Sequence, residues 1–561
     1  MSGQHSDDVE NKKAPLEKVQ VDNSPTYITG HRLGKGGFGV VYVGARTGTS
    51  DQVAIKFERI NGEVSQSKKP NEWKAYEALS EIPGVPRIHY KGQQKGYHVL
   101  IMDFLGPSLR DCQDIVSVDW VKDIAIQTIK ILKDVHSIGY VHGDIKPNNL
   151  LFDSCGTSNR KLFLVDFGLA TRWKKDSGQH VEYDQQPNIF RGTAEYASVH
   201  THLGRTHSRR DDLESLAYTL IFLLRGSLLL KELEEENKDK VHRCFLVCKR
   251  KMSLSPEELC SSLPQCFRKF FEYVVGLKFD EKPKYKRCIS LFKGIRDPEK
   301  PISAVDVEQE AEHIRTGKPA TQWISVYDAR QPMKQRYHYN VTDENLKYFI
   351  EKGKEEKLFI SSVASFNNLW ALIIDAGTGF SDQVYKSSSS FHNEEWIKEQ
   401  WKEHYYITAI AGRDDGSSLI VMSKGTQYKQ QDYNVYDSFT FTPIKEIRGE
   451  DFYVTSMATA GTGSQWAVVM SRSDVTLGQD QVVELDFRYP YEGIHRRWEN
   501  GFQITATAAT PDQAAFIFTG PRNPQGLQVT YRSSNFPSQN IKKEWDRNMY
   551  VTSICYGRTI S

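Results

Sequence analysis

Residues 140–152 read Tyr-Val-His-Gly-Asp-Ile-Lys-Pro-Asn-Asn-Leu-Leu-Phe and carry the most specific pattern in the chain, His-x-Asp-x-Lys-x-x-Asn. Phosphoryl transfer requires a carboxylate that accepts the proton of an attacking hydroxyl, a cation near the transferred group and an amide oxygen that binds Mg²⁺. Asp144, Lys146 and Asn149 have these chemistries. We therefore assign them as candidate catalytic residues, with Asn149 also as a candidate metal ligand.

A glycine-rich stretch lies upstream at residues 33–41 and reads Leu-Gly-Lys-Gly-Gly-Phe-Gly-Val-Val. A dinucleotide site would need a helix directly after such glycines. Here residues 40–43 continue as a strand, and a second strand follows at residues 53–57. A strand, a glycine loop and a second strand form the arrangement that covers the ATP phosphates in protein kinases, with Lys56 placed near the α- and β-phosphates.

A third motif, Leu-Val-Asp-Phe-Gly at residues 164–168, places the Asp166 carboxylate at the end of an apolar run. Mg²⁺ prefers hard oxygen ligands, so Asp166 and Asn149 are the candidate metal ligands. The three motifs in this order predict a site for ATP and Mg²⁺. The candidate ATP-binding residues from the motifs are Leu33, Gly34, Lys35, Gly36, Gly37, Phe38, Gly39, Val40, Val41, Ala54 and Lys56.

Lys56 needs a glutamate partner, and the chain offers Glu63, Glu72, Glu77 and Glu81. The spacing does not choose among them. We favour Glu72 because Glu72, Tyr76 and Leu79 lie near one face of a predicted helix.

The chain has 561 residues, of which 39% are hydrophobic and 26% charged, so we expect a folded protein with at least two cores. The net charge of +2 does not favour nucleic acid or an anionic membrane as a partner of the whole chain. The polar start of the chain has no apolar segment of a secretory signal, and its eight cysteines form no regular framework. We therefore expect a protein that is not secreted, with reduced, buried thiols, and we interpret residues 216–230 as a buried core helix.

Two halves of the chain differ in periodicity. Residues 27–295 begin with strand-like runs and then become helix-rich, with helical spacing at residues 120–136 and 212–224. We predict a disordered segment at 1–24, a two-lobed domain at 25–296 with lobes at 25–104 and 105–296, a linker at 297–320 and an all-β domain at 321–561.

An internal repeat occupies the last part of the chain. Aligned runs begin at Phe359, Tyr406, Tyr453, Gln503 and Tyr550, and Trp401, Trp498 and Trp545 each stand five residues before a start. Repeats of about 40–50 residues with short strands are typical of propellers and related β arrays. We predict a propeller-like domain of about five units that serves as a docking platform, and the ring could close within one chain or between chains.

The chain resembles casein kinase I in residues 105–109 (Leu-Gly-Pro-Ser-Leu), 192–198 (Gly-Thr-Ala-Glu-Tyr-Ala-Ser) and 208–215 (Ser-Arg-Arg-Asp-Asp-Leu-Glu-Ser). It is most similar to the plant nuclear branch often called photoregulatory or early-flowering-like casein kinases. The matching stretches of the C-terminal part are residues 333–339, 422–428, 493–498 and 555–559. The resemblance covers nearly everything after about Leu16.

The resemblance implies a two-lobed α+β protein kinase fold and an ATP-dependent Ser/Thr kinase with protein substrates. It adds Glu72, Met102, Asp103 and Leu105 to the expected ATP-binding residues, with residues 103–105 as the hinge. It also implies that Asp212 braces the catalytic loop, and that the protein is found in the nucleus, with the cytoplasm as a second location. We expect regulatory or chromatin-associated protein partners for the C-terminal repeats, and no membrane.

Two positions depart from common kinase patterns. Gly143 stands where many kinases have an arginine, and without that guanidinium a phosphorylated activation loop has no partner there. We therefore predict activity without activation-loop phosphorylation. In the expected substrate groove, near Thr193, the resemblance places Glu195 where the family has an arginine for phosphorylated or acidic substrates, and residues 232–236 are also acidic. Either this charge reversal weakens recognition of such substrates, or Glu195 merely pairs with a nearby arginine such as Arg191.

Two other functions remain open from the sequence. A pseudokinase scaffold acting through the repeats is the alternative to an active enzyme. Nucleic acid is the less favoured partner of the basic pairs beside Trp498 and Trp545, because acidic residues separate these pairs. Residues 248–251, Cys-Lys-Arg-Lys, fit either an import signal or an ordinary surface.

Overall fold

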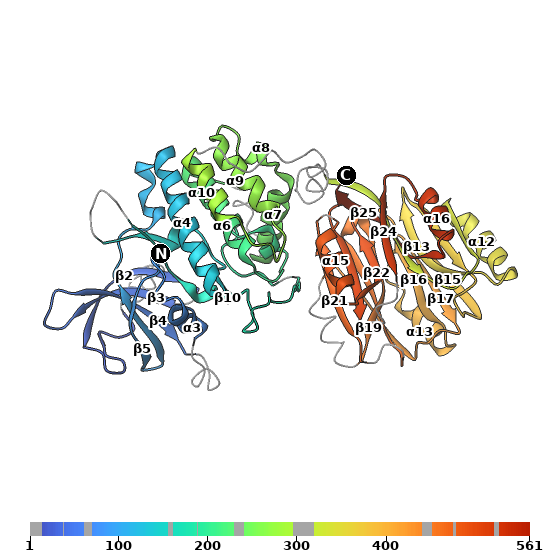
Figure 1. Cartoon of the computed structure of the whole chain (residues 1–561). Coiled ribbons are helices and arrows are strands. Elements are labelled where there is room, and N and C mark those ends of the chain that lie inside the picture. Colours follow the sequence, from blue (N-terminus) through green and yellow to red (C-terminus); the bar gives the residue numbers. More distant parts are fainter. Residues whose placement is uncertain are drawn as a thin grey trace, which may run out of the picture. The chain divides into compact units, whose positions relative to one another are not determined.

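The computed structural model describes residues 14–37, 39–60, 70–154, 161–187, 189–228, 240–294, 319–439, 451–474, 478–487, 489–520 and 527–560. The chain divides into two compact units, and the second comprises Gly317–Ser561 together with the short segments Asp184–Ile189 and Leu203–Arg205. The first unit is drawn from blue to green and the second from yellow to red (Figure 1). Among the helices that the structure describes, none has the length and apolar character needed to cross a membrane.

The first lobe of the first unit is an antiparallel sheet with the strand order β1-β2-β3-β4-β6-β5. The strands are β1 (Lys18–Val19), β2 (Tyr27–Gly36), β3 (Gly39–Arg46), β4 (Gln52–Arg59), β5 (Ile88–Gln94) and β6 (Tyr97–Asp103), and the helix α3 (Asn71–Ala78) accompanies them. As predicted, the glycine-rich stretch forms a hairpin between β2 and β3. Gly39 has φ 134°, and a Cβ there would lie 2.2 Å from the carbonyl oxygen of Phe57, so only glycine fits.

The predicted disorder of residues 1–24 is wrong for the end of that segment. β1 pairs with β2, and Leu16, Val19 and Val21 are buried against the sheet. Burial of these apolar side chains offsets the entropy lost when the segment is ordered. The folded first unit therefore begins before the predicted boundary at residue 25.

The second lobe is helical and has its core between α4 and α6 and the helices that follow. Its helices are α4 (Val118–Ile138), α5 (Val199–His202), α6 (Arg209–Arg225), α7 (Lys240–Ser253), α8 (Pro256–Leu259), α9 (Gln265–Val275) and α10 (Tyr285–Lys293). The short strands are β7 (Tyr140–Val141), β8 (Leu150–Phe152), β9 (Leu162–Leu164) and β10 (Thr171–Arg172). The predicted core helix at 216–230 ends earlier, at Arg225, because Gly226 adopts the left-handed conformation that terminates helices.

The second unit contains five three-stranded antiparallel sheets. In chain order its strands are β11 (Pro319–Ala329), β12 (Gln335–Val341), β13 (Phe359–Phe366), β14 (Leu369–Asp375), β15 (Asp382–Ser388), β16 (Tyr406–Gly412), β17 (Ser418–Lys424), β18 (Gln430–Tyr436), β19 (Tyr453–Ala460), β20 (Gln465–Arg472), β21 (Asp480–Asp486), β22 (Gln503–Ala509), β23 (Ala514–Gly520), β24 (Gln528–Ser533) and β25 (Met549–Ile560). The sheets are β12-β14-β13, β15-β17-β16, β18-β20-β19, β21-β23-β22 and β24-β11-β25. The last sheet joins the first strand of the unit to its final two.

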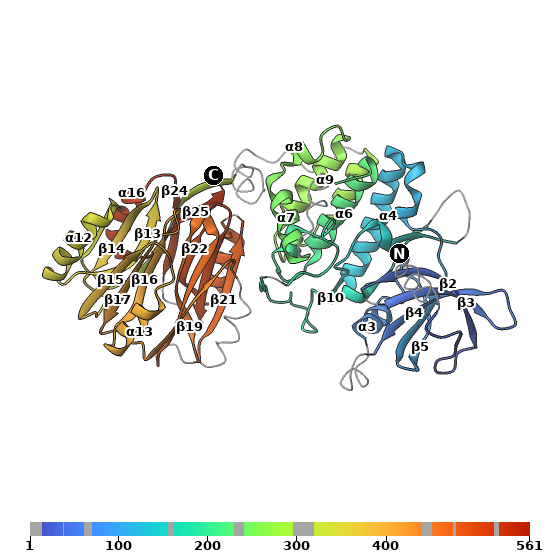
Figure 2. The ribbon, with the colours of Figure 1, turned by 180° about the vertical axis from the view of Figure 1, so that it is seen from behind.

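The repeat runs aligned in the sequence are the strands β13, β16, β19, β22 and β25. Each contacts the next in this series, and β25 contacts β13. The helices α12 (Asp343–Glu355), α13 (Glu394–Lys402), α15 (Tyr491–Glu499) and α16 (Ser538–Trp545) lie at the periphery of the sheets (Figures 1 and 2).

A glutamine connects neighbouring sheets at five equivalent places. The Gln335 side-chain amide donates to the Val551 carbonyl and accepts from its N–H, both at 3.0 Å. The other four pairs with both bonds are Gln383 with Ile360, Gln431 with Ile407, Gln481 with Val454 and Gln528 with Ile504. The landmark tryptophans Trp401, Trp498 and Trp545 donate to Gln431, Gln528 and Gln335. The repeated glutamine therefore forms the same hydrogen bonds between each pair of neighbouring sheets.

The seven cysteines that the structure describes are all free thiols, and none is fully exposed. This agrees with the expectation of reduced, mostly buried thiols.

Candidate active site

A cavity of about 840 Å³ lies between the glycine-rich hairpin and the catalytic loop. Twelve predicted ATP-binding residues line it, namely Leu33, Gly34, Lys35, Gly36, Gly39, Val41, Ala54, Lys56, Glu72, Met102, Asp103 and Leu105. Gly37 and Val40 do not line it, and Phe38 lies outside the described residues. Val40 packs with the cluster around Val19 instead, because successive side chains of a strand point to opposite faces.

The glycine-rich hairpin leaves open space beside the cavity. A Cβ added at Gly34, Gly36 or Gly37 would meet no atom within 4 Å. These glycines therefore keep their backbone accessible, which is what a hairpin that covers phosphates requires.

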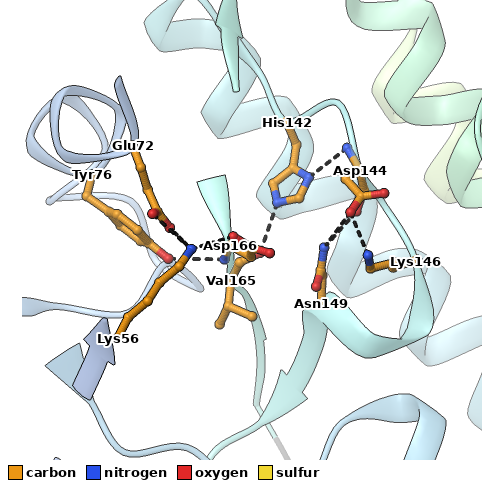
Figure 3. Close-up of polar contacts among 9 residues, drawn as sticks. All are labelled: Lys56, Glu72, Tyr76, His142, Asp144, Lys146, Asn149, Val165 and Asp166. Atoms are coloured by element: carbon orange, nitrogen blue, oxygen red, sulfur yellow. Dashed lines mark hydrogen bonds and ion pairs between the residues drawn. The ribbon is translucent and has the colours of Figure 1, made fainter. Parts of the chain in front are cut away.

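Lys56 lies at the centre of a buried ion cluster (Figure 3). Its Nζ is 2.7 Å and 2.9 Å from the two carboxylate oxygens of Glu72, and 2.7 Å from Oδ1 of Asp166. Burial disfavours the ammonium, but the carboxylates of Glu72 and Asp166 outweigh burial and raise the pKa of Lys56. Burial likewise favours the neutral form of Asp166, yet Lys56 holds the pKa of Asp166 below its ordinary value. Both groups are therefore charged at neutral pH.

Of the three candidate glutamates that the structure describes, Glu72 is the one that pairs with Lys56. It lies in the first turn of α3 and is only 5% exposed. Glu77, one helical turn further, pairs with Lys91, whereas Glu63 lies outside the described residues. The choice of Glu72 agrees with the helical face inferred from the sequence.

The catalytic loop brings together the predicted catalytic residues (Figure 3). Nζ of Lys146 donates to Oδ2 of Asp144 at 2.6 Å and to the Thr193 hydroxyl at 2.9 Å. The Thr193 hydroxyl donates to Oδ1 of Asp144 at 2.8 Å. Nδ2 of Asn149 donates to the backbone carbonyl of Asp144 at 2.9 Å, which leaves the Asn149 Oδ1 for another contact.

Asp212 is buried at the start of α6 and binds the backbone of the catalytic loop. Its carboxylate accepts hydrogen bonds from the backbone N–H groups of His142 and Gly143, at 2.8 Å and 2.9 Å, and lies 2.8 Å from Nε2 of His136. Gly143 has φ 80°, a conformation that favours glycine over the arginine common in other kinases. The bracing role expected for Asp212 thus matches its contacts.

Glu195 pairs with Arg243 of α7, at 2.6 Å, and not with Arg191. Both side chains are partly exposed. The acidic residues 232–236 lie outside the described residues.

Phe104 lines the cavity as part of the predicted hinge at residues 103–105. Sequence reasoning missed several other cavity residues, namely Gly106, Pro107, Ser108, Asp111, Asn148, Leu151, Ser154 and Val165. It used Tyr76 only to orient a helix, although Tyr76 also lines the cavity and bonds to the backbone of Asp166. The position of Tyr76, one turn after Glu72 on the same helix, was the available signal for its role.

Comparison with protein families matches residues 27–292 to the protein kinase domain, and residues 296–561 to a domain of unknown function, DUF7477. The casein kinase 1-like protein HD16 of rice (Oryza sativa subsp. japonica) is 52% identical over 97% of this chain and 81% of that protein.

The chain belongs to the casein kinase I family of protein kinases.

Casein kinase I homologs 2 and 1 of Schizosaccharomyces pombe are each 37% identical over 47% of this kinase, covering 61% and 60% of their own lengths. This casein kinase I relative is therefore a Ser/Thr protein kinase with an added mostly β C-terminal unit. The kinase motifs and the family resemblance inferred from the sequence are confirmed.

Proposed function

We propose that this protein is an active Ser/Thr kinase that uses Mg·ATP without phosphorylation of its activation segment. The observation that carries the proposal is the ion cluster in which Lys56 contacts both Glu72 and Asp166 in the unmodified chain. Kinases that depend on activation-segment phosphorylation use it to bring these groups together. Here the groups are together already, which also disfavours the pseudokinase alternative.

The chain's own residues have defined tasks in phosphoryl transfer. Asp144 orients the acceptor hydroxyl and takes its proton, while the ammonium of Lys146 stabilises charge that develops on the transferred group. Lys56 binds the nucleotide phosphates, and Glu72 keeps the Lys56 ammonium in position. The cavity beside the hinge is large enough for a nucleotide.

The residues present also fit a magnesium ion. The Asn149 Oδ1 and the second carboxylate oxygen of Asp166 are hard oxygen donors, and Asp166 retains 30% exposure of its side chain. When bound by Asn149 and Asp166, Mg²⁺ would neutralise part of the negative charge of the nucleotide phosphates.

For substrates, we propose weak dependence on prior phosphorylation. The Glu195 carboxylate neutralises the Arg243 guanidinium beside the residues that contact Asp144, so an incoming phosphate would compete with a charge already in place. Basic acceptors would meet less repulsion here than at a purely cationic groove.

For the C-terminal unit, we propose a closed, propeller-like ring of five units that recruits substrates or regulatory partners in the nucleus. Supporting this are the contacts in series from β13 to β25 and from β25 back to β13, and the sheet shared by β11 and β25. Rings of repeats present a rigid surface on which partners dock.

The test measures phosphate transfer from radiolabelled Mg·ATP to casein, to a basic histone-type protein and to the chain itself. The intact chain, produced without phosphorylation, is compared with the variant Asp144→Asn. Transfer that disappears in the variant supports the enzyme. Failure of the intact chain on every acceptor, with ATP binding retained, would support the scaffold alternative, and activation only after phosphorylation near Thr193 would overturn the proposed independence.

A further inference from the structure

Lys251, near the end of α7, is a buried lysine that the catalytic mechanism does not use. It is 5% exposed, and its Nζ lies 4.2 Å from the centroid of the Tyr218 ring. Its ammonium donates to the backbone carbonyls of Ala194, at 2.9 Å, and Ala197, at 2.6 Å. Burying an ammonium costs free energy, and its hydrogen bonds to these carbonyls offset that cost. The presence of a lysine at this buried position therefore requires an explanation.

The segment that Lys251 contacts runs directly beside the catalytic carboxylate. Thr193, one residue before Ala194, donates its hydroxyl to Asp144. The N–H groups of Tyr196 and Ala197 both donate to the Thr193 carbonyl, which folds residues 193–197 into a tight turn. A protein acceptor that presents its hydroxyl to Asp144 must therefore pass over this turn.

A second donor holds the same turn. Nε2 of His202 lies 2.9 Å from the Ala194 carbonyl, and the His202 ring stacks on Phe190 with a centroid distance of 4.9 Å. Burial and the nearby Lys251 ammonium lower the pKa of His202 well below its ordinary value, so the imidazole is neutral at pH 7 and donates through Nε2–H.

Residues of α6 form hydrogen bonds with Ser198 and Val199, which follow the turn. The Ser198 hydroxyl donates to the buried Asp211, and the N–H of Val199 donates to the buried Glu214. Thus α6 contacts Ser198 and Val199, whereas Lys251 binds the carbonyls of Ala194 and Ala197. His202 binds the Ala194 carbonyl as well.

We propose that Lys251, assisted by His202, is a positioning residue for the protein acceptor. It clamps the Ala194 and Ala197 carbonyls and so holds the surface over which the acceptor lies. The acceptor role rests on the proposed phosphotransfer to protein hydroxyls. The clamp itself is a property of the fold and can be measured independently.

The experiment uses the full chain with Lys251→Met, which keeps the length of the side chain and removes its donors. Arg250→Met is the matched control, because Arg250 is the exposed neighbour on the same helix. We expect Lys251→Met to raise KM for a protein acceptor about tenfold and to change KM for ATP less than twofold. Lys251→Arg, which retains donors, should recover part of the loss, and Arg250→Met should match the wild type.

Hydrogen exchange of the amides of residues 193–198 gives the readout that does not need activity. We expect these amides to exchange at least tenfold faster in Lys251→Met than in the wild type. If Lys251→Met does not fold, His202→Phe keeps the stacking on Phe190, removes the other donor and should give a smaller effect of the same kind. Unchanged exchange, or equal changes in both KM values, would overturn the positioning role. An inactive wild type with faster exchange in the variant would instead contradict the proposed function and leave the clamp supported.

Discussion

The hydroxyl of Tyr76 accepts a hydrogen bond from the backbone N–H of Asp166, with an O···N distance of 3.1 Å. Asp166 has φ 64°, a left-handed conformation that is uncommon for residues other than glycine. The bond connects α3, which carries Glu72, to the segment that carries the Asp166 carboxylate, the proposed metal ligand. A single tyrosine thus couples two parts of the site that must be in place together.

Replacement of Tyr76 by phenylalanine should lower kcat about fivefold, because one hydrogen bond of about 1 kcal/mol no longer holds Asp166. The ring remains, so its edge contact with Phe167 and the melting temperature should change little. The control is Tyr90→Phe, because Tyr90 lies on the opposite face of the sheet. Steady-state kinetics of the two variants give the comparison. An equal kcat in both variants would contradict this coupling.

Asp212→Asn should destabilise the kinase unit by about 3 kcal/mol at pH 7, because a buried charged acceptor of several hydrogen bonds is lost. Burial favours the neutral carboxyl, but hydrogen bonding to His136 and to the loop N–H groups outweighs it and lowers the pKa of Asp212. Since the folded pKa lies below the unfolded value of about 3.9, this stabilisation is complete above about pH 4 and disappears as the pH falls through the folded pKa.

Thermal melting between pH 7 and pH 3 tests the Asp212 prediction. The difference in melting temperature between the wild type and Asp212→Asn should stay constant down to about pH 4 and become smaller below it. Asp119→Asn, at a site with 90% side-chain exposure, should melt like the wild type throughout. If the difference in melting temperature between the wild type and Asp212→Asn widened in acid, the predicted direction of the pH dependence would be wrong.

Glu195→Gln should increase the use of phosphorylated acceptors, because it removes the negative charge that lies 2.6 Å from the Arg243 guanidinium. We expect the ratio of kcat/KM for a phosphorylated peptide to that for its unphosphorylated form to rise at least threefold. Glu182→Gln is the control, since Glu182 pairs with Lys175 on an exposed surface. Wild-type enzyme that already strongly prefers the phosphorylated peptide would refute the proposed specificity.

Gln335→Leu should destabilise the C-terminal unit by about 2 kcal/mol, because both backbone polar groups of Val551 lose their partner. For a domain of this size, the melting temperature should fall by roughly 4–8 °C. Gln430→Leu, at an exposed position, should have little effect. Equal melting temperatures of the two variants would mean that the glutamine hydrogen bonds do not stabilise the C-terminal unit.

Val19→Asp should destabilise the first lobe by about 3 kcal/mol, because Val19 is fully buried against the sheet and a carboxylate there has no partner supplied by the substitution. Lys18→Asp places the same carboxylate at the exposed neighbouring position and should be tolerated. Limited proteolysis of the lobe distinguishes the two variants. Identical resistance would indicate that the segment before residue 25 contributes no stability.

The sequence alone was enough to predict the kinase fold, the candidate catalytic and metal-binding residues and the phases of the five repeats. These features are local, because the spacing within a loop or strand fixes which groups act together. The hairpin that covers the cavity and the helix that carries Glu72 follow from the same local patterns.

Only the tertiary structure decided which distant groups meet. Glu195 pairs with Arg243 instead of Arg191, Lys251 reaches the Ala194 carbonyl, and Gln335 meets Val551. The N-terminal segment looked disordered because its few apolar residues find a partner only on the sheet formed by later strands. Such contacts depend on packing between elements far apart in the chain, and side-chain spacing does not encode them.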